Sequence, residues 1–428
     1  MPELRELLDR EAAGASPAPD AYPRTVRRAR QFARRRRIGA AVIALALFAG
    51  LAGSLWLGVR SRNETPGPAE SDTPSTPAPP ESWEPGPSAE DSATALAELP
   101  VGWTRLAPPP MVRVRAASVW TGSELFYWGG DTDFGGTHHD DGAMYDPVKD
   151  AWRKLPPGPL SGRSSPAVVW TGSEVIVWGG YDGGGLADGA AFNPVTGVWR
   201  SVPRAPIPGR VPVAAVWTGS EVIVWGNTDR AAETVDGAAF DPVSNSWRAI
   251  PDAPSAMNLG HSAWTGREMI VIGAQLDGNN NSATDHAVGL AYDPAADTWR
   301  VLPDHLVSPQ SSSIAWLGTE LFVWDYVPRG AVYDPDRDAW RALPPMPLDP
   351  RECYSRTAVA GGVAVAWYCD HGAEFFPVSE AWRRMPDPPG DVYGDPVGAG
   401  PVVLFAGAAH ESVANGLFAY RPRPDPRA

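Results

Sequence analysis

Arginine recurs at one position of a repeated pattern in this sequence, seven residues ahead of a tryptophan. The examples are Arg113, Arg163 and Arg210, and Arg351 lies near the corresponding position of a later copy. Because a guanidinium donates paired hydrogen bonds to carboxylates and other oxyanions, such side chains around one rim predict a site for a carboxylate, a sulfate or a sugar acid. The alternative is that each arginine pairs with an acidic residue of a neighbouring loop.

The chain has two cysteines, Cys353 and Cys369, and both stand eight positions from Gly361. The segment around Gly361 is predicted to be a β-hairpin, so the two thiols would face each other across its strands. In an oxidising compartment, where disulfides form, we expect a cross-strand disulfide. A metal-binding or catalytic thiol is the alternative.

One loop concentrates side chains that can bind metal, His138-His139-Asp140-Asp141. Adjacent histidines alone do not define a metal site, which needs a third and a fourth ligand at a fixed spacing. We therefore expect a solvated loop. The sequence also has no phosphate-binding loop, dinucleotide motif or serine–histidine–aspartate order, so we predict no metal, no cofactor and no catalytic residue.

The elements that must position these residues belong to a repeated unit, seen most completely in residues 164–203. Its apolar segments 164–170 and 175–178 flank a Thr-Gly-Ser-Glu turn, which is typical of a β-hairpin. Two more short strands are expected at 189–192 and 198–202. Apolar residues on both faces of the strands indicate sheets packed between other sheets. Each unit is therefore one blade or one solenoid turn rather than a domain.

The spacing within the unit is constant. An aromatic residue and a tryptophan stand seven positions apart in Tyr145/Trp152, Phe192/Trp199, Phe240/Trp247, Tyr292/Trp299, Tyr333/Trp340 and Phe375/Trp382. An arginine follows each of these tryptophans. We interpret it as charge that protects an exposed strand edge, with a basic binding ring as the alternative.

The repeat resembles the Kelch repeat in its glycine pairs Gly129-Gly130 and Gly179-Gly180, in Tyr145-Asp146-Pro147 and its equivalents, and in Trp152 with its counterparts. The resemblance covers residues 101–422 and implies a Kelch-type β-propeller. Some Kelch propellers that this chain resembles are enzymes, among them copper galactose oxidases and sialic-acid mutarotases. The oxidases use two tyrosines, two histidines and a cysteine crosslinked to one tyrosine, and no such set can be placed here.

The number of blades follows from the two ends of the repeat region. After six full copies, residues 401–407 and 416–420 provide a second and a third strand, whereas residues 103–106 are a fourth strand with nothing before it. Joining these pieces completes a seventh blade and removes the exposed edges of an open array. We therefore predict an all-β, seven-bladed Kelch-type β-propeller closed by its N-terminal strand. Six blades with loose ends is the alternative.

The first hundred residues differ from the repeats. Residues 1–37 are basic, residues 38–59 carry no charge, and residues 60–100 are rich in proline, serine and glutamate. The uncharged segment is long enough to span a bilayer as one helix, and the arginines before it place the N-terminus in the cytoplasm. We predict a cytoplasmic segment, a single transmembrane helix and a disordered stalk. A cleaved signal peptide is the alternative to the helix.

Charge is unevenly distributed along the chain, whose net charge is −14. Residues 1–60 hold 11 arginines and 5 acidic residues, and the remainder holds 25 basic and 45 acidic residues. The acidic repeat region argues against a nucleic-acid partner, whereas the basic start fits an anionic membrane surface. We expect a plasma-membrane protein with the propeller, and a short tail at 423–428, outside.

The segments that vary between copies are 131–141, 181–188, 275–286 and 408–415. In a propeller they emerge on one face, and variable loops on a rigid scaffold often bind ligands. We expect a monomeric, membrane-anchored module that binds a protein or a glycan on this face. The alternatives are a carbohydrate-active enzyme of the oxidase or mutarotase type, and a transmembrane signalling protein whose residues 4–13 bind a cytoplasmic partner.

Overall fold

The computed structural model describes residues 83–425 and 427, apart from gaps at 112, 133–135, 227–233, 276–286, 305–312, 325–329, 349–354, 369–370, 391, 393 and 409–414. The predictions for residues 1–82, for Arg351 and for the disulfide between Cys353 and Cys369 lie outside the described residues. No described helix has the length and the apolar character needed to cross a membrane.

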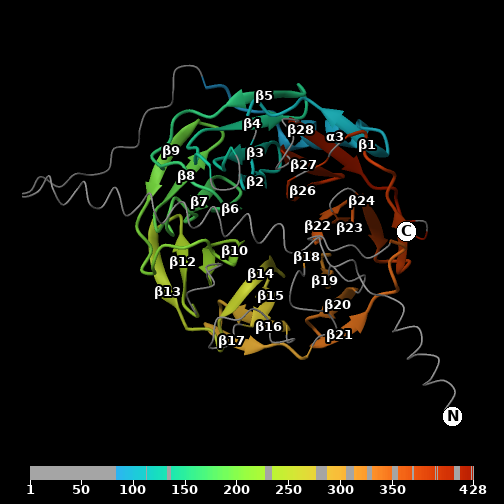
Figure 1. Cartoon of the computed structure of the whole chain (residues 1–428). Coiled ribbons are helices and arrows are strands. Elements are labelled where there is room, and N and C mark those ends of the chain that lie inside the picture. The colour runs from blue at the N-terminus through green and yellow to red at the C-terminus, as the bar shows by residue number, and fades with distance from the viewer. Residues whose placement is uncertain are drawn as a thin grey trace, which may run out of the picture. The chain divides into compact units, whose positions relative to one another are not determined.

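The described strands form seven antiparallel sheets of four strands each, which we call blades 1–7 and which surround a common centre (Figure 1). Blade 1 has β2 (Ala117–Trp120), β3 (Leu125–Trp128), β4 (Gly142–Asp146) and β5 (Ala151–Lys154). Blade 2 has β6 (Ala167–Trp170), β7 (Val175–Trp178), β8 (Gly189–Asn193) and β9 (Val198–Val202). Blade 3 has β10 (Ala214–Trp217), β11 (Val222–Trp225), β12 (Gly237–Asp241) and β13 (Ser246–Ile250).

Blade 4 has β14 (Met257–Trp264), β15 (Met269–Gln275), β16 (Ala287–Asp293) and β17 (Thr298–Val301). Blade 5 has β18 (Ser313–Trp316), β19 (Leu321–Trp324), β20 (Gly330–Asp334) and β21 (Ala339–Ala342). Blade 6 has β22 (Ser355–Ala360), β23 (Val363–Tyr368), β24 (His371–Phe376) and β25 (Ala381–Arg384). Blade 7 has β26 (Pro396–Ala399), β27 (Val402–Ala408), β28 (Asn415–Arg421) and β1 (Gly102–Leu106).

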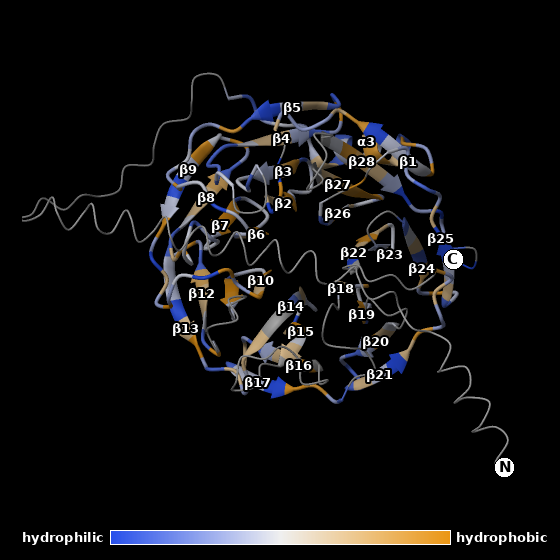
Figure 2. Cartoon of the chain, in the orientation of Figure 1, coloured by the Kyte–Doolittle hydropathy of each residue, from blue (hydrophilic) through white to orange (hydrophobic). Residues whose placement is uncertain are grey.

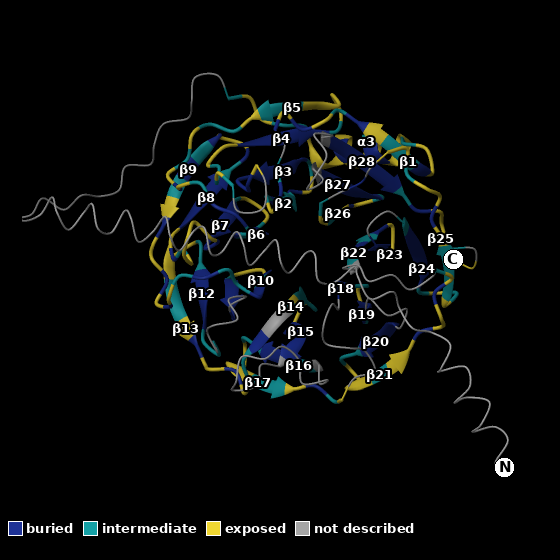
Figure 3. Cartoon of the chain, in the orientation of Figure 1, coloured by how far each residue is buried: buried dark blue, intermediate teal, exposed yellow. Residues whose placement is uncertain are grey.

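Burial follows the position of a strand within its blade. The second strands β3, β7, β11 and β19 are buried along their whole length, because each is covered by a neighbouring blade on both faces. The outermost strands, such as β5 and β21, consist of exposed and half-buried residues (Figure 3). Hydrophilic residues accordingly gather on these outer strands (Figure 2).

The ring is closed by the first strand of the chain, as predicted. Strand β1 pairs with β28 from Gly102 opposite Arg421 to Leu106 opposite Leu417, so the two ends of the propeller lie in one sheet (Figure 1). The innermost strands β26 and β2 are also in contact across the joint between blades 7 and 1. The seven-bladed architecture is therefore confirmed.

The tryptophan of each outermost strand bonds its blade to the chain that leaves the preceding blade. Its indole N–H donates to a backbone carbonyl in pairs Trp103–Pro386, Trp152–Ala107, Trp199–Pro156, Trp247–Pro203, Trp299–Pro251, Trp340–Pro303 and Trp382–Pro344, at 2.8–3.0 Å. The same bond thus recurs at all seven junctions, including the one that β1 makes.

The arginine after the tryptophan does more than place charge on an edge. In blades 1–5 it bonds the glutamate of the Thr-Gly-Ser-Glu turn or its equivalent in the same blade: Arg153–Glu124, Arg200–Glu174, Arg248–Glu221, Arg300–Glu268 and Arg341–Glu320. In blade 6 Arg383 bonds Glu374 of β24 instead. The ion pairs of blades 1–5 join the first turn of each blade to its outermost strand. Our interpretation of the arginines as charge on an exposed strand edge did not predict this contact.

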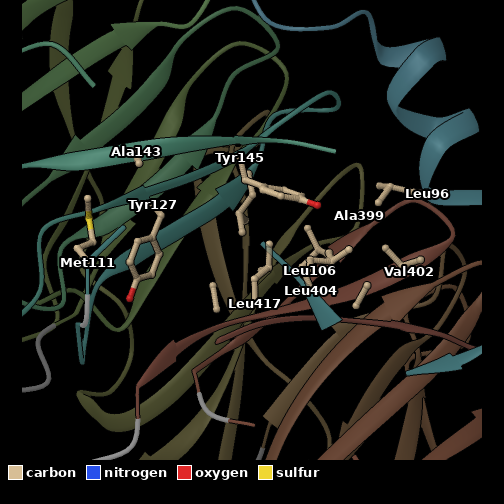
Figure 4. Close-up of a cluster of buried hydrophobic side chains, with 13 residues drawn as sticks. Leu96, Leu106, Met111, Tyr127, Ala143, Tyr145, Ala399, Val402, Leu404 and Leu417 are labelled. Atoms are coloured by element: carbon tan, nitrogen blue, oxygen red, sulfur yellow. The ribbon is translucent and has the colours of Figure 1, made fainter. Parts of the chain in front are cut away.

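Residues 89–98 differ from the expectation of a disordered stalk over residues 60–100. They form helix α3 (Ala89–Glu98), whose N-cap Ser88 accepts a hydrogen bond from the backbone N–H of Asp91 at 3.1 Å. Leu96 is 2% exposed and belongs to the apolar cluster that joins blades 7 and 1 (Figure 4). Ser92 and Leu96 are the buried residues of the helix, and the propeller supplies the surface that covers them.

Candidate functional site

The connections between the second and third strands, and between successive blades, emerge on one face of the ring, which we call the variable-loop face. In blade 1 the glycine pair Gly129-Gly130 starts such a connection, with φ of 73° and 84°. A Cβ on Gly130 would lie 2.6 Å from the carbonyl oxygen of Val114. The pair therefore lets the loop approach the segment that enters β2, and two backbone hydrogen bonds join Asp131 to Val114 at 2.9 Å.

Arg163 lies on this face but is fully buried and fully paired. Its five N–H groups donate to both carboxylate oxygens of Asp188 at 2.8 and 3.0 Å, to the carbonyl and hydroxyl oxygens of Ser161, and to the carbonyl of Gly179. A guanidinium has five donors, so none is left for a ligand. These hydrogen bonds also hold the pKa of Asp188 below its usual value.

Arg210 repeats this arrangement one blade further on. It is 1% exposed and donates to both carboxylate oxygens of Asp236 at 2.7 and 3.0 Å, and to the carbonyl of Pro208 at 3.0 Å. Arg113 pairs with Asp141 at 2.7 Å. The structure therefore places the three arginines at one register as predicted, and their geometry is that of the alternative reading, pairing with loop carboxylates.

A second cluster on the same face includes residues that the sequence did not single out. Asp131 is completely buried, and its carboxylate accepts hydrogen bonds from Arg115 and from Nδ1 of His138, the latter at 2.7 Å. Because a carboxylate only accepts hydrogen bonds, the Nδ1–H group of His138 is the donor. The cluster therefore places an imidazole and a guanidinium around one buried carboxylate.

Tyr181 of blade 2 completes this cluster. Its ring meets the His138 ring edge to face, with centroids 6.0 Å apart, and the residue is 43% exposed. Tyr181 and Asp131 occupy the same register, directly after a glycine pair. The position after a glycine pair could have identified both residues from the sequence. The residue there forms backbone hydrogen bonds with the segment that enters the innermost strand, as Tyr181 does with Ser164 at 2.9 and 3.0 Å.

Backbone strain coincides with this cluster. Arg115 and Ser165 stand at equivalent positions before β2 and β6, and both adopt left-handed conformations, with φ of 55° and 49°. The backbone N–H of Ser165 donates to the carbonyl of Arg115 at 2.9 Å, which links the two blades. Non-glycine residues in this region cost free energy and cluster at functional sites.

The predicted loop cluster is divided between two roles. His138 joins Asp131, whereas Nε2 of His139 lies 2.8 Å from the Thr132 hydroxyl. Burial and the nearby Arg113 guanidinium hold the pKa of His139 below its usual value, so its imidazole is neutral near pH 7. Among the described residues, no group of three or more His, Cys, Asp or Glu side chains is arranged to hold a metal ion.

The ring of seven four-stranded sheets closed by β1 defines the class of protein, a seven-bladed β-propeller. A family model described as the KLHDC2/KLHL20/DRC7 Kelch-repeats domain matches residues 115–323. Over these residues the match agrees with the repeat pattern, and together they support a Kelch-repeat β-propeller. No curated protein sequence matches the chain significantly.

A solved structure with a similar fold is a fungal alcohol oxidase of the AA5 family in complex with copper. The TM-score is 0.57, the sequences are 13% identical, and the match covers 76% of this chain and 77% of that chain. At this identity the similarity shows the shared fold and does not transfer the oxidase's chemistry.

Proposed function

We propose that this Kelch propeller is a binding module that holds a protein ligand on its variable-loop face, next to Tyr181 and His138. Kelch propellers generally mediate protein interactions. The observation that carries the proposal is the half-exposed Tyr181 ring beside a histidine held by the buried Asp131. An aromatic anchor that is already positioned loses little conformational entropy on binding.

The propeller is presented outside a membrane in this proposal, anchored through residues 38–59. Support comes from the uncharged sequence of that segment and from the arginines that precede it. Trp83 and Ser92 of α3 bond the turns opposite the variable-loop face, so residues 83–98 do not cover the proposed ligand face.

Photo-crosslinking tests the site. A photoreactive amino acid replaces Tyr181 in the full chain, expressed in cells, and a matched variant carries it at Val243, which is 93% exposed in the turn between β12 and β13. We expect discrete crosslinked species from position 181 and none from position 243. Asp131→Asn should abolish them, because it weakens the bond that positions His138. Equal products from both positions would contradict the proposal.

A glycan array with the detergent-solubilised full chain tests whether the ligand is a glycan instead of a protein. If the wild-type chain binds defined glycans and Asp131→Asn abolishes that binding, the ligand at this site is a glycan rather than a protein. Turnover of an offered sugar would instead favour the enzymatic alternative.

A further inference from the structure

In several blades, the turn between the two outermost strands carries a side chain that accepts a hydrogen bond from an arginine of the preceding blade. The residue two positions before the tryptophan adopts a left-handed conformation in blades 1–6, with φ between 48° and 69°. In blades 3–6 its side chain accepts a bond from the arginine of the preceding blade: Arg200–Asn245 at 2.6 Å, Arg248–Asp297 at 3.2 Å, Arg300–Asp338 at 2.8 Å and Arg341–Glu380 at 2.7 Å.

Blade 2 breaks this pattern, because the residue at the equivalent position is Gly197. Glycine has no side chain to accept a bond from Arg153. The Arg153 guanidinium instead stands 3.9 Å from the ring centroid of Trp83, a distance typical of a cation–π contact. Its Nη1 donates to the backbone carbonyl of Glu84 at 3.1 Å.

The missing side chain makes room for Trp83. A Cβ added to Gly197 would lie 2.3 Å from Cγ of the Trp83 ring, which no real contact allows. The ring also meets Phe192 edge to face, with centroids 5.5 Å apart, and its indole N–H donates to the carbonyl of Pro194 at 3.0 Å. Trp83 is thus held on several sides by blades 1 and 2.

The residues after Trp83 also fit this junction closely. A Cβ on Gly86 would lie 2.1 Å from Oε2 of Glu124, so a larger residue would have to displace that carboxylate. Beside the segment lies a cavity of about 550 Å³, whose lining includes Glu84, Pro85 and Asp146 together with three basic residues, Lys149, Arg153 and Lys154. The surroundings therefore suit an extended peptide with a tryptophan, an acidic residue and a small residue in this order.

We propose that the junction of blades 1 and 2 is a recognition slot for a Trp-Glu-Pro-Gly peptide, with residues 83–86 of the chain as its resident ligand. The slot exists because Gly197 replaces the side chain that bonds the arginine of the preceding blade in blades 3–6. When the resident tryptophan is removed, a second peptide with the same sequence displaces residues 84–86 and binds there. Such a slot is separate from the variable-loop face.

The test uses the full chain in detergent and a synthetic peptide, Ser-Trp-Glu-Pro-Gly-Pro-Ser, whose tryptophan is fluorinated for 19F NMR. The wild-type chain should not shift the 19F signal, because its slot is filled. Trp83→Ala should shift it, with a Kd below about 1 mM, since a tethered segment at millimolar effective concentration stays bound only if its own affinity is at least that strong. Adding Gly197→Asn should weaken binding at least about tenfold, since the new side chain occupies the tryptophan's place.

Asn245→Gly provides a gain-of-function arm that leaves the resident segment in place. It removes the Arg200 bond and recreates the glycine at the junction of blades 2 and 3, where Phe240 and Pro242 stand at the positions of Phe192 and Pro194. We expect this variant to bind the peptide although its first slot is filled. If Trp83→Ala fails to fold, as a thermal melt would show, Asn245→Gly decides. A folded Trp83→Ala chain that leaves the 19F signal unchanged, or equal binding with and without Gly197→Asn, would overturn the proposal.

Discussion

At the residue scale, the buried arginines of the variable-loop face stabilise loops. Arg163 and Arg210 connect the residues before an innermost strand to a carboxylate that precedes the third strand of the same blade. The partner carboxylates of Asp188 and Asp236 are partly exposed, with side-chain exposures of 51% and 32%. Solvent can therefore hydrate each carboxylate when its arginine is removed. The main cost of removing the arginine is that backbone carbonyl oxygens lose their donors and that the space of a buried side chain is left empty.

Arg163→Ala should lower the free energy of unfolding by about 1.5–3 kcal/mol, the usual contribution of hydrogen bonds to a charged group. Arg337→Ala is the matched control, because Arg337 forms an ion pair with Asp334 but its side chain is 80% exposed, and exposed pairs contribute less than about 1 kcal/mol. Denaturant unfolding of the two variants measures the difference. Unchanged stability in Arg163→Ala would contradict the stabilising role of this buried ion pair.

The pairing of Asp188 predicts a dependence on pH. Hydrogen bonds from Arg163 lower the pKa of Asp188 below 3.8. The stabilisation is therefore present in full above the unfolded-state pKa and is lost as the pH falls through the lower folded value. Asp188→Asn should be less stable than the wild type at pH 7, and the two melting temperatures should converge in the acid range below pH 4. A difference that persists unchanged there would contradict this assignment.

At the scale of elements, the closing strand β1 is held by side chains as well as by its ladder. Trp103 donates to the carbonyl of Pro386 at 2.8 Å, and its ring packs against Trp367, Phe405 and Tyr420 with centroids 4.8–5.3 Å apart. The strand therefore joins blades 6 and 7 through the same contact that operates at the other junctions.

Trp103→Phe removes this indole donor and should cost about 0.5–1.5 kcal/mol for the hydrogen bond. Trp247→Phe removes the equivalent bond to Pro203, also 2.8 Å long, within a continuous part of the chain. Similar losses in the two variants, measured by denaturant unfolding, are expected for a ring that is closed in solution. A clear loss in Trp247→Phe with none in Trp103→Phe would indicate that β1 is not docked.

At the scale of the whole molecule, residues 83–98 are attached to the propeller. Ser92 donates to the carbonyl of Ser123 at 2.7 Å, and Leu96 is buried between blades 7 and 1. In our proposal for the membrane anchor, only the residues between the membrane and Trp83 connect the propeller to the bilayer.

Protease added to intact cells that express the chain should therefore release the propeller by cutting between residues 60 and 82. The released fragment should keep residues 83–98, because docked segments are cut slowly compared with exposed ones. Mass spectrometry of the released fragment locates the cut. Protection of the propeller until the membrane is opened would contradict the proposed orientation.

The sequence by itself determined the repeat and its closure. The spacing of seven between an aromatic residue and a tryptophan, and the unmatched strand at residues 103–106, are local patterns. Strand pairing within a blade joins neighbours along the chain, so such patterns predict it directly. They also predicted that the three arginines share one register.

Only the tertiary structure decided which side chains meet across blades. His138 and Tyr181 come from loops of different blades, and their contact depends on how the ring sets the blades side by side. Trp83 stands alone in a proline-rich segment with no periodic pattern, and its place is set by a glycine more than one hundred residues away in the sequence. Contacts of this kind have no local signal, because they arise from the geometry of the closed ring.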